Sequence, residues 1–598
     1  MKRSMRLMFE ALVVLSLVLS ACAPATAPTP QIVEVTKEVP KEVIVTQVVP
    51  ATPEPAAVIF DRNETLYVGG TQWGPPTGFN PWNLGNYAAG TFGLCYESLF
   101  IYDPLTDEFT PWLAESGEWT SDTVYTVKVR PGITWSTGDP FTSADVKATF
   151  DIAKDAPVSI SPVWNYLASV ETPDESTAVF TFDQALYQRW ANFIYNTPII
   201  SAKNWTGKSV EDITSGLNPE PECTGPYTAE SLDQTKVVWA KRDGWWATAA
   251  YGLDPKPKRV VDLVNSSNEI SLGRVMRGDI DLNNNFLPGI STIVKGYGAI
   301  KTYFPDAPYH LSANTAWLLL NLTKKPMDDA AFRKAVAFAI DIDKIVNVDY
   351  AGMVAKANPT GLLPTWDKYV DQTVVDELGF SYYPDQAKKL LADAGYKDTD
   401  GDGFVEAPDG SKIELKINNP NGWSDWMEAN RIIVEGLQAA GINASTNFPE
   451  YGDYLSQRNE ATYDMMIAND AQMSNTPWTY YDWMLQNPIE DIATIQNGNY
   501  GRYENQEAFD LKDQLDQVKT DDVEGMKAII SQLQTIMLTD MPLIPLWYNG
   551  VWSQVNNTYW TNWPSGVEGS NHWLPASWRG YWNMTAIKML AELEPVAP

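Results

Sequence analysis

Seven prolines in residues 23–57 most constrain where this 598-residue chain can begin to fold. They are Pro24, Pro28, Pro30, Pro40, Pro50, Pro53 and Pro55, in a segment otherwise dominated by Thr, Val, Ala and Glu. Proline fixes φ and removes a backbone donor, so no helix or strand register runs through this spacing. We therefore expect a disordered tether, extending about 3 Å per residue where it adopts polyproline II geometry, and folded structure from residue 58 onward.

A short apolar run precedes the tether. Basic residues near the N-terminus are followed by the run 11–19 and then by Leu19-Ser20-Ala21-Cys22, the order of a secretory signal. The run is too short for a membrane-spanning helix, which needs roughly 20 apolar residues. The four residues resemble the lipobox of bacterial lipoproteins. The resemblance implies that residues 1–22 hold a signal peptide and that a lipid on Cys22 anchors the chain to the extracytoplasmic face of the cell membrane. The alternative is an ordinary signal peptide with a chance cysteine.

The composition is that of an acidic chain that can fold. Hydrophobic residues make up 44% and charged residues 20%, so the chain can bury large cores in two or more lobes. The formal net charge of -32 argues against nucleic acid as a partner, because binding a phosphate backbone requires clustered Lys and Arg.

Reactive side chains are few. The two histidines, His310 and His572, leave little for zinc binding or histidine-based catalysis, and we find no nucleophile-elbow, phosphate-loop or dinucleotide motif. Cys95 and Cys223 are the one pair left once Cys22 is assigned to the lipid. The sequence leaves open whether they form a disulfide.

Alternation and helical spacing predict mixed secondary structure. Residues 125–129 and 178–182 are strand candidates, and Thr142 followed by Asp145 predicts a capped helix start. After residue 328, apolar side chains recur with helical spacing in segments 332–339, 387–394 and 429–440, with a strand candidate at 413–417. This helix-strand-helix order indicates an α/β lobe.

Several segments carry a more specific pattern. They are Cys95–Phe100 (CYESLF), Pro111–Ser116 (PWLAES), Tyr125–Ser136 (YTVKVRPGITWS), Thr224–Tyr227 (TGPY), Arg333–Asp343 (RKAVAFAIDID) and Tyr383–Tyr396 (YPDQAKKLLADAGY). Together they resemble the extracytoplasmic solute-binding proteins of ABC transporters, family 5, in order from about residue 66 to 550.

The resemblance implies an α/β fold of the two-lobed periplasmic-binding-protein type II (cluster C) kind, with a hinge and an interlobe cleft. Lobe I is expected at 58–314, with an inserted subdomain at about 91–219, lobe II at 315–543, and a return to lobe I at 544–598. It also implies a receptor, expected to be a monomer, that delivers a solute to the permease subunits of an ABC importer and catalyses nothing.

Two solute classes remain open at this stage. The peptide branch of the family carries a DYPDP-type segment whose aspartate pairs with the amino group of the peptide, and this chain has Asp470 there without that motif. Segments similar to the cellobiose-type branch lie at 69–82, 421–426, 475–481 and 559–564. We therefore expect a β-linked di- or oligosaccharide, with an oligopeptide as the alternative and a secreted glycoside hydrolase, which would need two carboxylates flanking the sugar, as the less favoured class.

Aromatic residues supply the candidate ligand contacts. The chain has 24 Trp and 28 Tyr, and an indole is a flat plate suited to the CH-rich face of a sugar ring, while Asn and Asp suit hydroxyl groups. The residues predicted to bind ligand are Trp73, Asn80, Trp82, Trp423, Asn469, Asp470 and Trp478. The alternative for each is a core aromatic or a turn-forming polar residue. Some Trp residues of the C-terminal segment are also expected to face the cleft.

An acidic loop resembles a calcium-binding EF-hand loop. Its acidic residues at positions 1, 3, 5, 9 and 12 are Asp398, Asp400, Asp402, Glu406 and Asp409, with Gly403 at position 6. The loop is followed by a strand candidate where an EF-hand has a helix. We expect no cofactor other than a structural calcium here, and a solvated acidic turn is the alternative.

Overall fold

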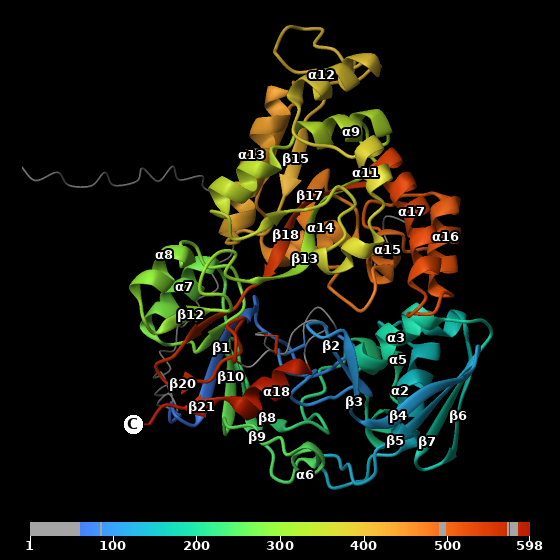
Figure 1. The fold of residues 1–598 in the computed structure, drawn as a ribbon, viewed down its shortest axis with the longest axis vertical. Coiled ribbons are helices and arrows are strands. Elements are labelled where there is room, and N and C mark those ends of the chain that lie inside the picture. Colours follow the sequence, from blue (N-terminus) through green and yellow to red (C-terminus); the bar gives the residue numbers. More distant parts are fainter. Residues whose placement is uncertain (1–59, 84–86, 490–497, 571–572, 575–583, 598) are drawn as a thin grey trace, which may run out of the picture. The chain divides into compact units, whose positions relative to one another are not determined.

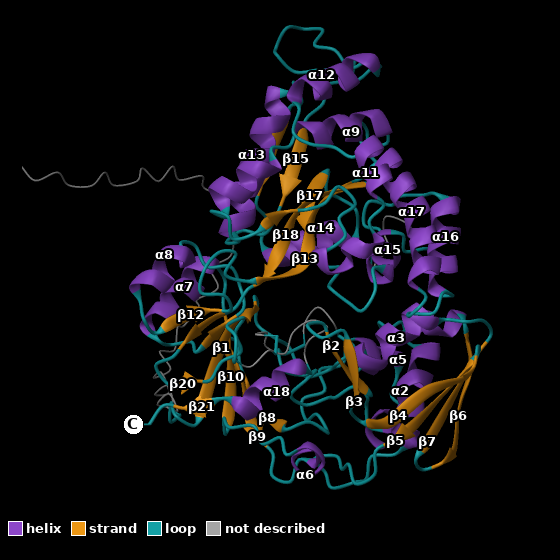
Figure 2. Cartoon of the chain, in the orientation of Figure 1, coloured by secondary structure: helices purple, strands orange, loops and turns teal. Residues whose placement is uncertain are grey.

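The computed structural model describes residues 60–83, 87–489, 498–570, 573–574 and 584–597. The predicted signal peptide with Cys22 and the tether 23–57 lie outside the described residues, as does His572. The folded body that begins at Phe60 contains two α/β lobes and a smaller antiparallel insert, shown in chain order and by secondary structure in Figures 1 and 2.

Lobe I is built on a seven-stranded sheet with the order β12-β19-β11-β1-β10-β9-β8. The strands are β1 (Thr65–Gln72), β8 (Tyr227–Leu232), β9 (Lys236–Lys241), β10 (Arg259–Val264), β11 (Leu282–Asn283), β12 (Ile300–Thr302) and β19 (Gln554–Asn556). Its helices are α6 (Trp246–Tyr251), α7 (Asn268–Arg277), α8 (Ile290–Gly296) and α18 (Thr585–Glu592), and β20 (Trp560–Thr561) pairs with β21 (Glu594–Pro595) beside it. Strand β1 runs parallel to β10 and β11, so these three strands end at the same edge.

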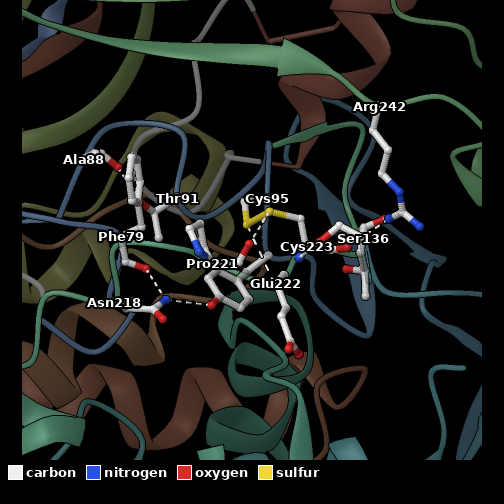
Figure 3. The surroundings of a disulfide bond; sticks show 12 residues. Phe79, Ala88, Thr91, Cys95, Ser136, Asn218, Pro221, Glu222, Cys223 and Arg242 are labelled. Carbon is white, nitrogen blue, oxygen red and sulfur yellow. Dashed lines mark hydrogen bonds between the residues drawn. A yellow bond between two sulfur atoms is a disulfide. The ribbon is translucent and has the colours of Figure 1, made fainter. Parts of the chain in front are cut away.

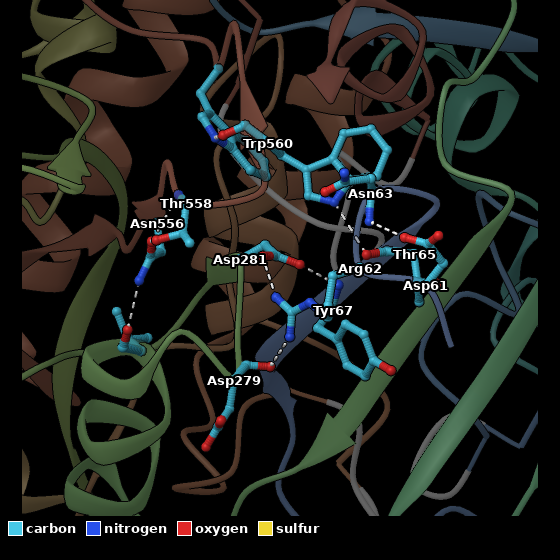
Figure 4. A network of polar contacts seen from close by, with 12 residues as sticks. Asp61, Arg62, Asn63, Thr65, Tyr67, Asp279, Asp281, Asn556, Thr558 and Trp560 are labelled. Atoms are coloured by element: carbon cyan, nitrogen blue, oxygen red, sulfur yellow. Dashed lines mark hydrogen bonds and ion pairs between the residues drawn. The ribbon is translucent and has the colours of Figure 1, made fainter. Parts of the chain in front are cut away.

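The C-terminal segment is fastened to β1 by a buried polar network (Figure 4). Asp281 accepts hydrogen bonds from Arg62 Nη2 at 2.6 Å and from the Tyr67 backbone amide at 2.8 Å. The Asp281 carbonyl accepts from the Asn556 amide, and Trp560 Nε1 donates to the Thr65 carbonyl at 3.1 Å. Burial raises the pKa of Asp281 to about 7 despite the neighbouring Arg62. Hydrogen bonds between residues far apart in sequence therefore hold the C-terminal segment against β1 in lobe I.

The region of the insert, predicted at about 91–219, is mainly antiparallel. Its four-stranded sheet has the order β4-β5-β7-β6, beside the hairpin β2-β3. The elements are β2 (Phe100–Asp103), β3 (Glu108–Pro111), β4 (Ala114–Ser121), β5 (Val124–Val129), α2 (Ser143–Asp155), the 3-10 helix η1 (Ser161–Asn165), β6 (Leu167–Asp174), β7 (Thr177–Phe182), α3 (Tyr187–Asn196), α4 (Ala202–Trp205) and α5 (Val210–Thr214). Thr142 and Asp145 form the reciprocal capping box of α2, which confirms the predicted helix start.

Lobe II is built on a six-stranded sheet with the order β14-β18-β13-β17-β15-β16. Its strands are β13 (Leu311–Leu320), β14 (Ala355–Lys356), β15 (Leu415–Asn418), β16 (Ala444–Asn447), β17 (Met465–Ala468) and β18 (Leu543–Val551). Helices α9 (Ala330–Ala339), α10 (Ile342–Lys344), η2 (Ile345–Asp349), η3 (Pro364–Tyr369), α11 (Gln372–Leu378), α12 (Pro384–Asp393), α13 (Ser424–Ala439), α14 (Tyr451–Asn459), α15 (Trp478–Met484), α16 (Gln506–Asp516) and α17 (Val523–Asp540) cover it. Strands β15 and β17 are parallel neighbours.

The chain passes between the lobes at the ends of two adjacent strands. Strand β13 enters the lobe II sheet at Leu311 and β18 leaves it at Val551, after which β19 joins the lobe I sheet. The predicted border at residue 314 lies within β13 and that at residue 543 is the first residue of β18, whereas the chain changes lobe near residues 311 and 551.

None of the described helices is both long and apolar enough to cross a membrane.

Candidate ligand-binding site

A cavity of about 440 Å³ lies between the two sheets. From lobe I it receives the segments that follow β1, β10 and β11, including Trp73, Asn268 and Asn285. From lobe II it receives the segments that follow β15 and β17, including Trp423 and Asn469. Ligands of open α/β sheets bind beyond the carboxyl ends of parallel strands, and here two sheets present such ends to one space.

Aromatic rings from both lobes form one wall of the cavity. The ring centroids of Trp73 and Trp423 lie 5.2 Å apart with the planes tilted by 45°, so an indole of lobe I touches an indole of lobe II. Trp423 also contacts Trp426 at 4.8 Å and Tyr451 at 5.7 Å between centroids. Because Trp423 immediately precedes helix α13, its ring is held at the end of a rigid element.

Carboxamide side chains form most of the polar lining. They are Asn268, Asn284, Asn285, Asn314, Asn469, Gln472 and Asn549. Several bond to one another: Asn469 Nδ2 donates to Asn314 Oδ1 at 3.2 Å, and Asn314 Nδ2 donates to Gln472 Oε1 at 2.9 Å. Asn285 Nδ2 donates to Asn268 Oδ1 at 2.8 Å. The buried Asn285 Oδ1 accepts no hydrogen bond from the described residues.

The charged side chains that line the cavity already have protein partners. Arg458 Nη1 donates to Asp470 Oδ1 in a close ion pair, which leaves the buried Asp470 Oδ2 without a partner among the described residues. Asp425 accepts from Asn268 Nδ2 at 3.1 Å and from the Tyr350 hydroxyl at 3.0 Å. Burial raises the pKa of Asp425 to about 6. No unpaired cation lines the described part of this cavity.

The structure brings four of the seven predicted ligand residues to the cavity. Trp73, Trp423, Asn469 and Asp470 line it. Asp470 does so as the partner of Arg458, a pairing that the sequence interpretation did not include.

The other three predicted residues lie elsewhere, and we correct their assignment to structural roles. The Asn80 side-chain amide donates hydrogen bonds to the backbone carbonyls of Ile213 and Gly216, at 2.9 Å each. Trp82 is buried in the hydrophobic core of lobe I. Trp478 is buried in a core of lobe II, with the Arg189 guanidinium 4.9 Å from its ring centroid. All three were predicted from polarity or ring chemistry, which does not distinguish a cleft from a core.

Sequence reasoning missed much of the carboxamide lining and part of the aromatic wall. Asn284 and Asn285 follow the short strand β11, and a run of Asn at a strand end is a usable signal. Tyr451 and Tyr454 stand three residues apart on α14, which places both rings on one helix face. Of the C-terminal tryptophans, Trp552 lines the cavity, whereas Trp547, Trp560 and Trp563 are core residues.

The acidic loop groups three of its five predicted ligands. Oxygen atoms of Asp398, Asp400 and Glu406 lie within 4.8 Å of one another. Lys412 pairs with Asp400 at 2.6 Å and with Asp402 at 3.2 Å, and Lys325 pairs with Asp409 at 3.1 Å. The loop is remote from the cavity lining, and calcium binding there stays a prediction.

The fold and the cavity define a two-lobed solute-binding receptor. The model of the bacterial extracellular solute-binding proteins, family 5 Middle, matches residues 108–490, more than half of the chain. The chain therefore belongs to this family, whose members are extracytoplasmic substrate-binding proteins and not enzymes. The family and the fold class expected from the sequence are both confirmed.

Solved structures with the same fold hold different ligands. A periplasmic oligopeptide-binding protein of an oligopeptide ABC transporter from Thermotoga maritima, crystallised with mannohexaose, is 41% identical. It has a TM-score of 0.87, and the match covers 90% of this chain and 100% of that one. The oligopeptide-binding protein AppA from Bacillus subtilis, bound to a nonapeptide, is 20% identical with a TM-score of 0.70 and covers 89% of this chain and 99% of its own.

Curated relatives are more distant in sequence. The dipeptide-binding protein of Escherichia coli K12 is 23% identical over 517 residues, which cover 81% of this chain and 89% of that protein. The resemblance thus extends through most of both chains.

Proposed function

We propose that this receptor captures a neutral, β-linked di- or oligosaccharide and delivers it to the permease of an ABC importer. The observation that carries the proposal is the composition of the cavity wall, which combines indole and phenol rings with carboxamides while the charged groups are paired within the protein. Sugar rings offer apolar faces and hydroxyl groups, and need no compensating charge.

Two further features favour a ligand rich in hydroxyl groups. Each of the seven lining carboxamides offers both donor and acceptor groups, which suits hydroxyl groups because a hydroxyl both donates and accepts. The volume of about 440 Å³ lies within the range of small-ligand sites. Trp73 and Trp423 are too close to admit a ring between them, since two stacking contacts need roughly 7 Å. The sugar would therefore lie against one indole face or separate the pair.

The mannohexaose-bound relative supports the sugar assignment, because it is far more similar to this chain than the peptide-bound neighbour. The peptide alternative rests on the curated relatives, several of which are named for peptides. In that alternative, Asp470 would receive the peptide's ammonium group in competition with Arg458.

The test is calorimetry and thermal unfolding of the purified receptor with cello- and manno-oligosaccharides, and separately with di- to pentapeptides. Saturating sugar at 100 times Kd should stabilise the protein by about 2.7 kcal/mol, with the sugar recovered intact by chromatography. A calorimetric heat of binding for peptides, with none for sugars, would overturn the proposal. Released smaller sugars would indicate a hydrolase.

A matched pair of indole variants locates the site. Trp423→Ala should weaken sugar binding by at least about tenfold, since it removes a stacking plate from the cavity wall. Trp164→Ala removes another half-buried indole, in η1 of the insert and away from the cavity lining, and should leave the affinity unchanged. Equal losses in both variants would contradict the assigned site.

A further inference from the structure

The insert is locked to lobe I. Cys95 and Cys223 form a disulfide, which settles the question that the sequence left open and joins the start of the insert to the segment before β8 (Figure 3). Glu97 accepts hydrogen bonds from Trp112 Nε1 of the insert and from Trp246 Nε1 of α6, both at 2.9 Å. One hydrophobic cluster runs without a break from Leu66 of β1 into the insert. The insert therefore moves with lobe I.

Helix α3 of the insert carries a buried arginine onto lobe II. Arg189 Nη2 donates to Asp482 Oδ1 at 2.6 Å, and its Nε donates to Asp516 Oδ2 at 3.1 Å. The backbone amide of Arg189 donates to Asp516 Oδ1 at 2.9 Å. Arg189 is 8% exposed and Asp516 3%, so this pair is shielded from water, whereas the Asp482 side chain is 29% exposed at its edge. Figure 1 shows α3 beneath α16, away from the strands that connect the lobes.

The neighbouring glutamine makes a second set of contacts across the same boundary. Gln188 Nε2 donates to the Val518 carbonyl at 2.7 Å, and Thr476 Oγ1 donates to Gln188 Oε1 at 2.6 Å. Gln188 is 1% exposed. Leu105, in the turn of the β2-β3 hairpin, packs against the lobe II core as well. Two elements of the insert, α3 and the β2-β3 hairpin, therefore contact lobe II, the first through polar groups and the second through an apolar side chain.

A receptor whose lobes move about the connecting strands must break these contacts when it opens. We propose that helix α3 is a closing latch, in which Arg189 and Gln188 dock on α15, α16 and the segments beside them and hold the closed arrangement. A buried ion cluster adds little net stability, because the cost of removing the charges from water is about as large as their mutual attraction. It forms, however, in only one relative position of the two lobes. Loss of the Arg189 side chain leaves the buried Asp516 and the half-buried Asp482 without their guanidinium partner in the closed form alone.

The latch can be tested without any ligand. Exposed residues Lys203 of α4 and Glu524 of α17 are replaced by Cys and labelled with a fluorophore pair, and the distance between lobes is followed by single-molecule energy transfer. The wild type should populate mainly the short distance. Arg189→Ala should lower the closed-to-open ratio by at least about tenfold, since open lobes hydrate the two carboxylates.

Two further variants complete the experiment. Arg431→Ala removes an exposed arginine that is paired with Glu428 on α13. This control variant should show the same distance distribution as the wild type. Identical distributions for Arg189→Ala and Arg431→Ala would overturn the proposal. If Arg189→Ala does not fold, Thr476→Val provides the test, because it removes the hydrogen bond to Gln188. A shift toward the long distance, smaller than that expected for Arg189→Ala, would support the latch. The same populations as in the wild type would overturn it. Because no sugar is present, this outcome is independent of the proposed ligand.

Discussion

Glu97 is held by indole N-H groups, and it forms no ion pair with any residue that the structure describes. Its two oxygens each accept from one tryptophan, Trp112 and Trp246, and the side chain is fully buried. Burial raises the pKa of this carboxyl to about 7, against the opposing effect of the indole donors. A carboxyl group with a raised pKa stabilises the fold when it is protonated, so its contribution is complete at low pH and is lost as the pH rises.

We predict that Glu97→Gln flattens the pH dependence of stability. Between the ordinary glutamate value near 4.5 and the folded value near 7, Glu97 should lower the free energy of unfolding of the wild type by about 3 kcal/mol. The variant should lack this decline. Urea unfolding across that range measures it, with Glu115→Gln on the exposed face of β4 as the control that follows the wild type. Parallel profiles for wild type and Glu97→Gln would show that Glu97 does not titrate in this range.

The candidate site shows how far single residues could be assigned from sequence. Trp73 and Trp423 reached the cavity because they follow a strand and precede a helix, respectively. Asn80 and Trp82 offer the same amide and indole groups, but Asn80 donates to backbone carbonyls of the insert and Trp82 is buried in the core. Residue type therefore indicated what kind of contact was available, and burial decided whether a ligand could reach it.

At the scale of elements, the helices of lobe II pack closely at a glycine. Gly436 of α13 is buried against α9, and a Cβ at this position would lie 2.1 Å from the Ala339 carbonyl oxygen. A carbonyl in a helix cannot move aside without shifting the helix, so a side chain here forces the two helices apart.

We therefore predict opposite effects for two glycine substitutions in helices. Gly436→Ala should lower the free energy of unfolding by about 1–3 kcal/mol through overpacking. Gly452→Ala in α14, where a Cβ would meet no atom within 4 Å, should raise it by about 0.5–1 kcal/mol through helix propensity. Thermal and urea unfolding provide the comparison. A destabilised Gly452→Ala or a neutral Gly436→Ala would contradict this account of the packing.

Local patterns predicted individual elements but made no prediction of how the strands pair. The capped start of α2, the strands at 124–129 and 177–182, and helices α9, α12 and α13 all follow from spacing over a few residues. The neighbours of β1 in its sheet are β10 and β11, about 200 residues later in the chain, and no local pattern encodes that choice.

At the scale of the whole molecule, attachment and capture are separate properties of the chain. The receptor fold begins at Phe60, and the predicted anchor at Cys22 lies outside the described residues. The predicted lipid would hold the protein at the membrane while its lobes remain free to bind a solute.

We predict that Cys22→Ala moves the protein from the membrane fraction to the soluble fraction of its host, because the thiol that would carry the lipid is gone. Cell fractionation followed by immunoblotting measures the distribution. Thr26→Ala, in the predicted tether, should stay with the membrane. A Cys22→Ala protein that remains with the membrane to the same extent would refute lipid attachment at this cysteine.

The sequence by itself determined the family, the alternation of helices and strands, and an acidic composition rich in aromatic residues. Only the tertiary structure decided that Cys95 meets Cys223, that Arg458 neutralises Asp470, and that Arg189 of the insert reaches lobe II. The physical reason is range: propensity and periodicity act over a few residues, whereas a cavity, a disulfide or a buried ion pair depends on which distant segments share one space.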